Sequence, residues 1–388
     1  MYAIVIGASG ESVYAIKKAK SKGLHIIAFD ENENAEGLKY ADESFVVDIR
    51  NPQKIFDIID NKNIDPKEMV VLPVPIGRYI ISSGSFNDHY GLIGPSRKTT
   101  EICTDKWLFH ETLSKESLRE AEHQLVNAGK LPDKPQKFPV ILKPRYGAGS
   151  RDVLFISNEN EWENALNNFP CEEDFIVEDA IGGTEYGVDG LVFNGDFHTV
   201  LIRKKIITLP PYRQCVGYLS ITEANDDRIT SVVQSYMEKL TSAIELKDGV
   251  VHADIMIEDN KPFVIEMSAR PSGHRLHDLF TPMVTGVDMI SVYIDYCSGK
   301  SNSIAPQKRE DIYLIRYFDI ETEVRRIPNR SHMMDKYNLL EYECNMVEGE
   351  KKKIKDGHSL MGRGFFVLKD KTEELACKKA NELLREFI

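Results

Sequence analysis

The chain has 388 residues, of which 42% are hydrophobic and 28% charged, a composition typical of a globular protein of two or three domains. Its 61 acidic residues outnumber its 49 basic ones, and the net charge of −12 disfavours binding to nucleic acid or to an anionic membrane. The six cysteines form no C-x-x-C pair, and no apolar run reaches the roughly 18–20 residues of a membrane helix. The N-terminus shows no secretory pattern, so we expect a cytoplasmic protein with reduced thiols.

The N-terminal hundred residues alternate between two kinds of pattern. Apolar runs predict strands at residues 2–6, 25–29, 45–47 and 69–72, and helical patterns follow the first strand and cover 52–60. Strands that alternate with helices indicate a parallel α/β sheet, and we expect this domain to span residues 1–98.

A glycine-rich turn, GASG at residues 7–10, follows the first strand. Such turns expose backbone N–H groups that can hold a phosphate. The spacing falls short of G-x-G-x-x-G, and Asp30 alone does not complete a nicotinamide site. We favour a tight turn, and a dinucleotide-dependent oxidoreductase is the alternative from another class.

The middle of the chain is richer in strands. We expect residues 105–129 to be helical, as one helix or two, and further helices at 226–245 and 372–387. Between them, runs such as TEYGVDGLVF and FHTVLIRKKI alternate in polarity, which is typical of antiparallel strands. The segment 207–220, with Tyr212 and Arg213, is expected to overlie a substrate pocket.

The stretch KPRYGAGSRDV, residues 143–153, combines a strand-end lysine with a loop rich in glycine. Lys143 offers a fixed cation, and the loop from Tyr146 through Gly147, Ala148 and Gly149 to Ser150 offers backbone donors. Both suit the phosphates of a nucleotide, and a flexible loop could close over them. A plain hairpin turn explains the loop alone equally well.

Two glutamates flank the next turn, in FIVEDAIGGTEYGVDGL. Glu178 ends an apolar strand, and Glu185 follows the Ile-Gly-Gly connection after Ile181. A strand-end acid can accept a hydrogen bond from a ribose hydroxyl, and the backbone near Ile181 can bond an adenine edge. Taken alone, such glutamates are more often solvated charges.

Asp254 and Glu266 lie in adjacent apolar strands, in VHADIMIEDNKPFVIEMSARPSGH. A three-residue connection over 259–261 would place the two acids side by side, whereas a two-residue turn would put them on opposite faces. Carboxylates side by side repel unless a cation lies between them, and Mg²⁺ combines a few carboxylates with phosphate oxygens. We therefore predict a metal site at this pair.

Taken in order, the motifs Asp105-Lys106, KPRYGAGSRDV, VEDAIGGTEYGVDG and HAD…IEMSARPSG resemble those of the ATP-grasp superfamily, particularly its carboxylate–amine ligases. The resemblance covers nearly the whole chain. It implies a mixed α/β and α+β architecture, in which a Rossmann-like pre-ATP-grasp domain (1–98) precedes a small lid lobe (99–190) and a large lobe (191–388).

The resemblance also implies roles for individual residues. Lys106 and Lys143 would contact the phosphates of ATP, the loop 146–150 would cover them, Glu178 and Ile181 would hold adenine, and Glu185 the ribose. Asp254 and Glu266 would bind Mg²⁺, or Mn²⁺ in its place. Ser268 stands at a third metal position, where the family often has Asn, so whether it coordinates stays open. Arg270 would steady the reacting carboxylate, with Arg203 assisting.

The activity that the resemblance implies is ATP-dependent amide formation. A small-molecule carboxylate would attack the γ-phosphate to give an acyl phosphate, and an amine would then displace phosphate. Activation of bicarbonate or formate, and nucleotide binding without catalysis, are the alternatives. The substrates and the oligomeric state, for which a homodimer is one candidate, stay open.

Overall fold

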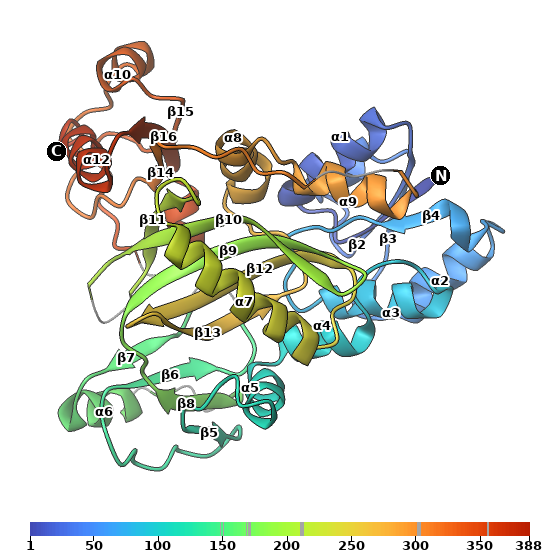
Figure 1. The fold of residues 1–388 in the computed structure, drawn as a ribbon, viewed down its shortest axis with the longest axis horizontal. Helices are drawn as coiled ribbons and strands as arrows, with labels where there is room; N and C mark the ends of the chain where they lie inside the picture. The colour runs from blue at the N-terminus through green and yellow to red at the C-terminus, as the bar shows by residue number, and fades with distance from the viewer. Residues whose placement is uncertain are drawn as a thin grey trace.

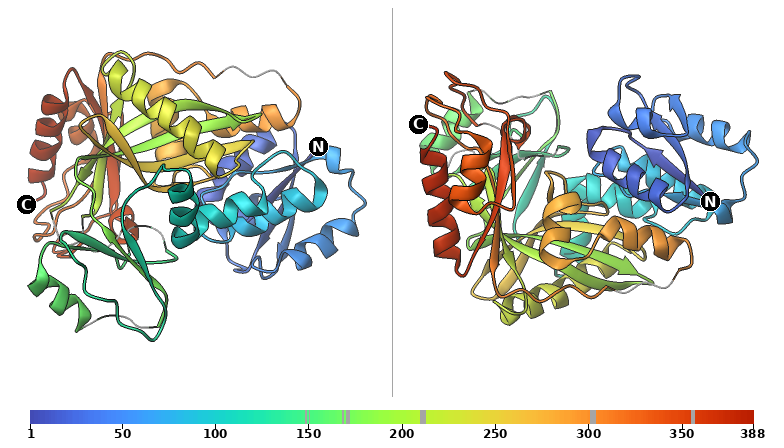
Figure 2. Two further views of the ribbon diagram at one scale, coloured as in Figure 1. Left: turned by 60° about the horizontal axis from the view of Figure 1, so that its bottom comes forward. Right: turned by 90° about the horizontal axis from the view of Figure 1, so that it is seen from above.

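The computed structural model describes residues 1–147, 149, 151–167, 169, 172–209, 213–300, 304–354 and 357–388. Its strands form a four-stranded N-terminal sheet, a second four-stranded sheet and an eight-stranded sheet. Figure 1 shows these sheets in three separate lobes, with the N-terminus and the C-terminus at opposite ends of the molecule. A rotated view shows the same separation (Figure 2).

The N-terminal sheet is parallel, as predicted, in the order β3-β2-β1-β4. Its strands are β1 (Tyr2–Ile6), β2 (His25–Asp30), β3 (Glu43–Val46) and β4 (Met69–Val71). Its helices are α1 (Val13–Ser21), α2 (Pro52–Asp60) and α3 (Ile80–Tyr90), with short 3-10 turns η1 (Gly10–Ser12), η2 (Glu36–Tyr40) and η3 (Pro66–Glu68). Apolar residues of β1, β2 and β4 pack against the helices on both faces of the sheet.

The GASG turn is filled by neighbouring chain. The N–H of Ala8 donates to Asp30 Oδ2 at 2.7 Å, so the acid that could have marked a ribose instead holds the turn. A Cβ at Gly7, where φ is +92°, would lie 2.3 Å from Ile76 Cδ1. This close approach supports the interpretation of GASG as a tight turn, because the loop after β4 occupies the space above it.

The second sheet, with α6, forms what we call the small lobe. Its strands, in the order β5-β8-β6-β7, are all antiparallel. They are β5 (His123–Val126), β8 (Phe175–Asp179), β6 (Val140–Pro144) and β7 (Leu154–Ile156), and α6 spans Glu159–Leu166. Helices α4 (Arg97–Thr104) and α5 (Lys106–Lys115) lead into this lobe. The prediction that residues 105–129 are helical throughout was therefore wrong beyond Lys115: β5 follows, because pairing with β8 outweighs the local helical pattern.

The eight-stranded sheet, here called the large sheet, has the order β13-β12-β9-β10-β11-β14-β16-β15. Its strands are β9 (Thr184–Phe193), β10 (Asp196–Ile207), β11 (Cys215–Ile221), β12 (Gly249–Glu258), β13 (Lys261–Ser268), β14 (Ile312–Tyr317), β15 (Glu341–Cys344) and β16 (Gly364–Asp370). The helices of this region are α7 (Asp227–Ala243), the π-helix η4 (Leu276–Phe280), α8 (Thr281–Thr285), α9 (Met289–Cys297), α10 (Arg330–Tyr337), α11 (Gly357–Met361) and α12 (Glu373–Arg385). In Figure 1, α7 lies across the sheet, and its apolar side packs on Val251, Ala253 and Ile255.

The hairpin β12–β13 reaches the predicted pairing by a different route. Glu258 pairs with Lys261, so the turn has two residues, Asp259 and Asn260, both in the left-handed region at φ +48° and +64°. That turn alone would have put Asp254 and Glu266 on opposite faces. A bulge beyond Ile255 adds one residue to β13, and Asp254 thus pairs with Glu266.

Among the described residues, no helix is both long enough and apolar enough to cross a membrane.

Candidate functional site

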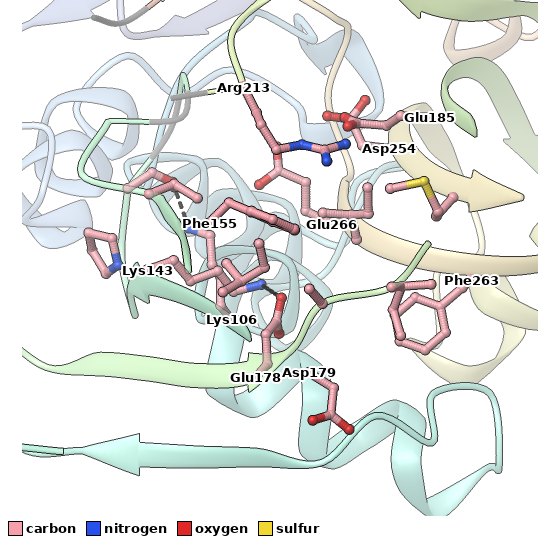
Figure 3. Close-up of a pocket in the computed structure, with 18 of the residues that line it drawn as sticks. Lys106, Lys143, Phe155, Glu178, Asp179, Glu185, Arg213, Asp254, Phe263 and Glu266 are labelled. Atoms are coloured by element: carbon pink, nitrogen blue, oxygen red, sulfur yellow. Dashed lines mark hydrogen bonds and ion pairs between the residues drawn. The ribbon is translucent and has the colours of Figure 1, made fainter. Parts of the chain in front are cut away.

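A pocket lies between the small lobe and the large sheet, and we call it the interlobe pocket. Its cavity measures about 160 Å³, and its lining includes Lys106, Lys143, Glu178, Glu185, Asp254 and Glu266. Figure 3 shows Glu178 and Asp179 on the side of the small lobe, with Glu185 and Asp254 across the pocket and Arg213 extending toward them. The structure thus brings together six residues that were predicted for the site from the sequence, and they span positions 106 to 266 of the chain.

Glu178 is the centre of a buried charge cluster in the small lobe. Lys143 Nζ donates to Glu178 Oε1 at 2.6 Å, and Arg119 Nη2 donates to Glu178 Oε2 at 2.6 Å. His110 Nε2 lies 3.2 Å from Glu178 Oε2. Both carboxylate oxygens therefore already have partners, and Glu178 fixes Lys143 at the pocket wall.

The pKa values of this cluster follow from burial and charge. Burial by itself would raise the pKa of Glu178, but Lys143 and Arg119 outweigh it and hold the pKa at about 2. Burial lowers the pKa of Lys143, and Glu178 opposes that shift. Burial, with the adjacent Arg119, lowers the pKa of His110 to about 2, so this imidazole is neutral at pH 7.

A second row of charges crosses the large sheet. Arg203, Gly187, Asp254 and Glu266 pair in register through β10, β9, β12 and β13. A Cβ at Gly187 would lie 3.3 Å from Arg203 Nη2 and 3.6 Å from Asp254 Oδ1. Glycine at this position therefore lets the guanidinium and the carboxylate approach each other across the middle strand.

Lys205 lies one pleat further along β10 and joins two acids. Its Nζ is 2.6 Å from Glu185 Oε1 and 2.6 Å from Asp254 Oδ2, and only 6% of its side chain is exposed. Burial by itself would raise the pKa of Asp254, but Lys205 and the nearby His252 and Arg203 outweigh it, and the pKa is lowered. Asp254 is therefore a carboxylate at neutral pH although only 9% of it is exposed.

Arg203 lies at the β10 end of this row and is fully buried. Its Nη2 donates to Asp189 Oδ1 at 2.8 Å, and its Nη1 donates to the other oxygen of the same carboxylate. His252 Nδ1 lies 3.2 Å from Asp189 Oδ1. Arg203 is therefore not among the residues that line the interlobe pocket, and its charge acts on Asp254 across Gly187.

The acidic pair fits a hard divalent cation. Asp254 Oδ1 is buried and has no hydrogen-bond partner among the described residues, although His252 Nε2 lies 3.7 Å from it. Glu266, directly opposite, forms no ion pair or hydrogen bond with any residue in the described ranges. The described residues contain no group of three or more His, Cys, Asp or Glu side chains suited to a metal, so the remaining ligands would be water or phosphate oxygens.

The other predicted nucleotide contacts lie around the same pocket. Lys106 Nζ donates to Gly147 O at 2.9 Å, and the Tyr146 hydroxyl donates to Asp105 Oδ2 at 3.0 Å. These two hydrogen bonds connect the glycine loop to the start of α5. Ile181 lines the pocket. Gly149 accepts a backbone hydrogen bond from Gly357 at 3.3 Å. Ala148, Ser150 and Tyr212 lie outside the described residues.

Arg270 and Ser268 lie at the end of β13, beside the interlobe pocket. Both line a neighbouring cavity together with Glu266. Arg270 Nη1 donates to Pro271 O at 2.8 Å. Arg213, from the segment expected to overlie the substrate, lines the interlobe pocket, whereas Arg275 pairs with Asp278 at 2.7 Å and is exposed.

Sequence reasoning missed Lys205, Arg119, His110 and Asp189. A signal existed for Lys205, because Arg203 and Lys205 are two apart in a strand and so share a face. Arg119 and His110 carry no local signal. They reach Glu178 from 59 and 68 positions away, within a segment to which the sequence assigned no role.

Comparisons with known proteins find similarity over the residues of this site. A family model described as an ATP-grasp domain matches residues 136–278, which include Lys143, Glu178, Glu185, Asp254 and Glu266. The chain is 27% identical over 173 residues to a formate-dependent phosphoribosylglycinamide formyltransferase of Prochlorococcus marinus, covering 42% of this chain and 43% of that protein. It is 26% identical over 198 residues to a D-alanine–D-alanine ligase of Petrotoga mobilis, covering 48% of this chain and 64% of that protein.

The fold extends the similarity to the whole chain. The crystal structure of an L-amino acid ligase from Bacillus licheniformis superposes with a TM-score of 0.76 at 16% identity, covering 100% of this chain and 97% of that one. Residues 136–278 therefore match an ATP-grasp domain in sequence, and the whole chain shares its fold with this L-amino acid ligase.

Proposed function

We propose that the protein is an ATP-dependent ligase that joins a small-molecule carboxylate to an amine through an acyl phosphate, releasing ADP and phosphate. The observation that carries the proposal is the charge row across the large sheet. Asp254 and Glu266 face each other with free acceptor oxygens, while Lys205 and Arg203 flank the pair on one side. Lys106 and Lys143 line the same pocket.

This arrangement suits a reaction between two anions. The substrate carboxylate and the γ-phosphate repel each other, so their approach needs fixed positive charge that is already in place. Lys106, Lys143 and Lys205 supply that charge from three different elements around one pocket. A divalent cation bound by Asp254 and Glu266 would neutralise phosphate oxygens and orient them.

In this proposal, residues of the small lobe and the turn that follows it bind the adenosine part of ATP. The backbone N–H and C=O of Ile181 form no hydrogen bond with another described residue, so they are free to bind an adenine edge. Glu185 is positioned for the ribose, with Lys205 holding its carboxylate. Glu178 acts indirectly, because its two oxygens are used by Lys143 and Arg119.

Burial of the reacting groups matters for the same chemistry. An acyl phosphate hydrolyses readily, so water has to be excluded once it forms. The glycine loop is tied at Gly147 and Gly149 to α5 and to Gly357, which places it over the pocket mouth. The cavity of about 160 Å³ is smaller than the roughly 300–1,000 Å³ of typical ligand sites, so we expect the small lobe to open for ATP.

Activation of formate or bicarbonate is the second candidate, favoured by the match to a formate-dependent enzyme. The matches to a D-alanine–D-alanine ligase and an L-amino acid ligase favour amide formation. Both candidates use the same charge row, and only the acid and the amine differ.

The test is phosphate release from ATP and Mg²⁺ with pairs of carboxylic acids and amines, and with formate or bicarbonate in separate arms. The double variant Asp254→Asn/Glu266→Gln should abolish substrate-dependent release. Glu258→Gln, an exposed acid at the end of the same hairpin, is the matched control. Release that depends on an acid and an amine supports the ligase, and dependence on formate or bicarbonate alone supports the second candidate. ATP binding without any stimulated turnover contradicts both.

A further inference from the structure

A second cavity, which we call the side cavity, adjoins the interlobe pocket. It measures about 290 Å³ and shares Lys106, Gly147 and Glu266 with that pocket. Its other walls come from the N-terminal domain, through the loop after β4, and from the end of β13. A molecule in the side cavity therefore borders on the reacting end of the nucleotide pocket while it contacts a domain that the nucleotide site does not use.

The lining of the side cavity is strongly cationic. Arg78, Lys106 and Arg270 face a single acid, Glu266. Within the described ranges, neither Arg78 nor Arg270 forms an ion pair with a carboxylate. Arg270 Nη1 donates to the carbonyl of Pro271, and Glu266, Glu11 and Asp254 lie close enough to act on its charge. Because both guanidinium groups line one cavity, an anion bound in it would be attracted by each of them.

Arg78 is held in place by contacts of its own. It follows Gly77 in the loop that leaves β4, directly before α3. Its guanidinium carbon lies 4.6 Å from the centroid of the Tyr146 ring at the start of the glycine loop. Stacking of this kind leaves the in-plane N–H groups of arginine free to bind a carboxylate or a phosphate in bidentate fashion.

The rest of the lining is apolar or small, including Ile76, Phe109, Met267 and Ala269. A compact carbon skeleton fits such walls, with charged groups at its ends. Formate and bicarbonate have a single carbon and no second group, so neither explains an arginine at the far wall. The molecule that fills the side cavity has to carry an anionic group of its own.

We propose that Arg78 binds a second anionic group, a carboxylate or a phosphate, on the small substrate whose reacting group lies beside Arg270 and Glu266. This inference rests on the proposed ligase function, since it names the class of one of its substrates. Arg78 is then a specificity-determining residue that the N-terminal domain supplies to a site formed mainly by the two lobes.

The test uses matched pairs of compounds that differ only in the second charge: succinate and succinamate, L-glutamate and L-glutamine, O-phospho-L-serine and L-serine. Dissociation constants are measured by titration calorimetry in the presence of ADP and Mg²⁺, and KM and kcat where turnover occurs. The wild-type protein should bind at least one charged member at least about 10-fold more tightly than its neutral partner, the discrimination typical of one bidentate charge contact. The carboxylate and phosphate pairs distinguish the two anions.

Arg78→Gln should remove this preference while leaving affinity for the neutral member unchanged, and Arg78→Lys should restore part of it. Arg50→Gln, an exposed arginine of the same domain paired with Asp48, is the charge control and should keep the preference. Tyr146→Leu removes the stacked ring and separates a role in loop contact from a role in substrate binding.

An Arg78→Gln variant that keeps the ratio between charged and neutral members overturns the proposal and leaves Arg78 as a contact of the glycine loop. Failure of every charged compound to bind the wild-type protein also overturns it. If the proposed ligase function itself is wrong, the result is different: Asp254→Asn/Glu266→Gln would leave ATP turnover unchanged, independently of any effect of Arg78→Gln.

Discussion

Two acids face each other across the interlobe pocket with opposite surroundings. Glu178 in the small lobe has Lys143, Arg119 and His110 around it, and both of its oxygens are bonded. Within the described residues, Glu266 in the large sheet has no ion pair or hydrogen bond, and its neighbour Asp254 keeps one buried oxygen without a hydrogen-bond partner.

This difference in hydrogen bonding distinguishes an acid with a structural role from an acid that is available to bind a ligand. A buried carboxylate with every oxygen satisfied contributes to the position and stability of its lobe, because removing it leaves uncompensated cations. A carboxylate with free acceptors has a desolvation cost that its surroundings do not offset, which is typical of residues that wait for a ligand. We therefore expect changes at Glu178 to alter mainly stability, and changes at Glu266 to alter mainly activity.

The largest effect is expected for Glu178→Gln. Removing this charge leaves Lys143 and Arg119 buried without a counter-ion, and the free energy of unfolding should fall by about 3–5 kcal/mol. Denaturant unfolding at pH 7 measures it. The exposed pair of Lys134 and Glu159 in the same lobe gives the control, since Glu159→Gln should cost no more than about 1 kcal/mol. Equal losses in the two variants would contradict the comparison.

Glu266→Gln should have the opposite effect, with a large loss of activity and little loss of stability. Because this side chain has no ion pair or hydrogen bond with a described residue to lose, the free energy of unfolding should change by no more than about 0.5 kcal/mol. Substrate-dependent kcat should fall by about 10²–10³-fold, the range observed when one preorganised electrostatic group is removed from an active site. Steady-state phosphate release and unfolding are measured on the same preparation. A variant that loses stability but keeps kcat would reverse the assignment.

The cluster around Glu178 also predicts a dependence of stability on pH. His110 has a pKa of about 2 in the folded protein and 6.5 when unfolded, so below pH 6.5 the unfolded state binds one proton more. The free energy of unfolding should therefore decrease as the pH is lowered below 6.5, by about 1.4 kcal/mol per pH unit for this group, or about 2–3 kcal/mol by pH 4.5. Below pH 4.5 Glu178 adds to the same trend, since its pKa is also about 2.

His110→Gln removes the first of these contributions. Unfolding curves between pH 6.5 and 4.5 should show a shallower loss of stability in the variant than in the wild-type protein. Parallel curves would mean that His110 takes up a proton in the folded state.

The smallest effect concerns the turn that sets the register of the acidic pair. Asn260 has φ +64°, a conformation that costs a β-branched residue about 1–2 kcal/mol more than glycine. Asn260→Val should lose about that much stability, whereas Asn260→Gly should keep it. Thermal unfolding of the two variants decides between them. If valine is tolerated as well as glycine, the two-residue turn does not fix the register.

The sequence predicted the surroundings of Glu266 better than those of Glu178. The pairing of Asp254 with Glu266 was predicted, although through a turn of the wrong length: a two-residue turn and a bulge together give the same register as a three-residue turn. The partners of Glu178 were not predicted, because Arg119 and His110 lie in a segment whose local pattern indicated helix and nothing more.

By itself, the sequence determined the parallel N-terminal sheet, the order of the strands along the chain and most of the charged residues that line the interlobe pocket. These follow from period-2 and period-3.6 patterns and from charged residues in apolar runs, which are local properties. Only the tertiary structure decided which charges neutralise one another and which stay free. Lys205 pairs with Asp254, Arg203 pairs with Asp189, and Arg78 lines the side cavity from the loop after β4. Electrostatic partnership depends on distances of a few ångströms between segments far apart in the chain, and no local pattern encodes those distances.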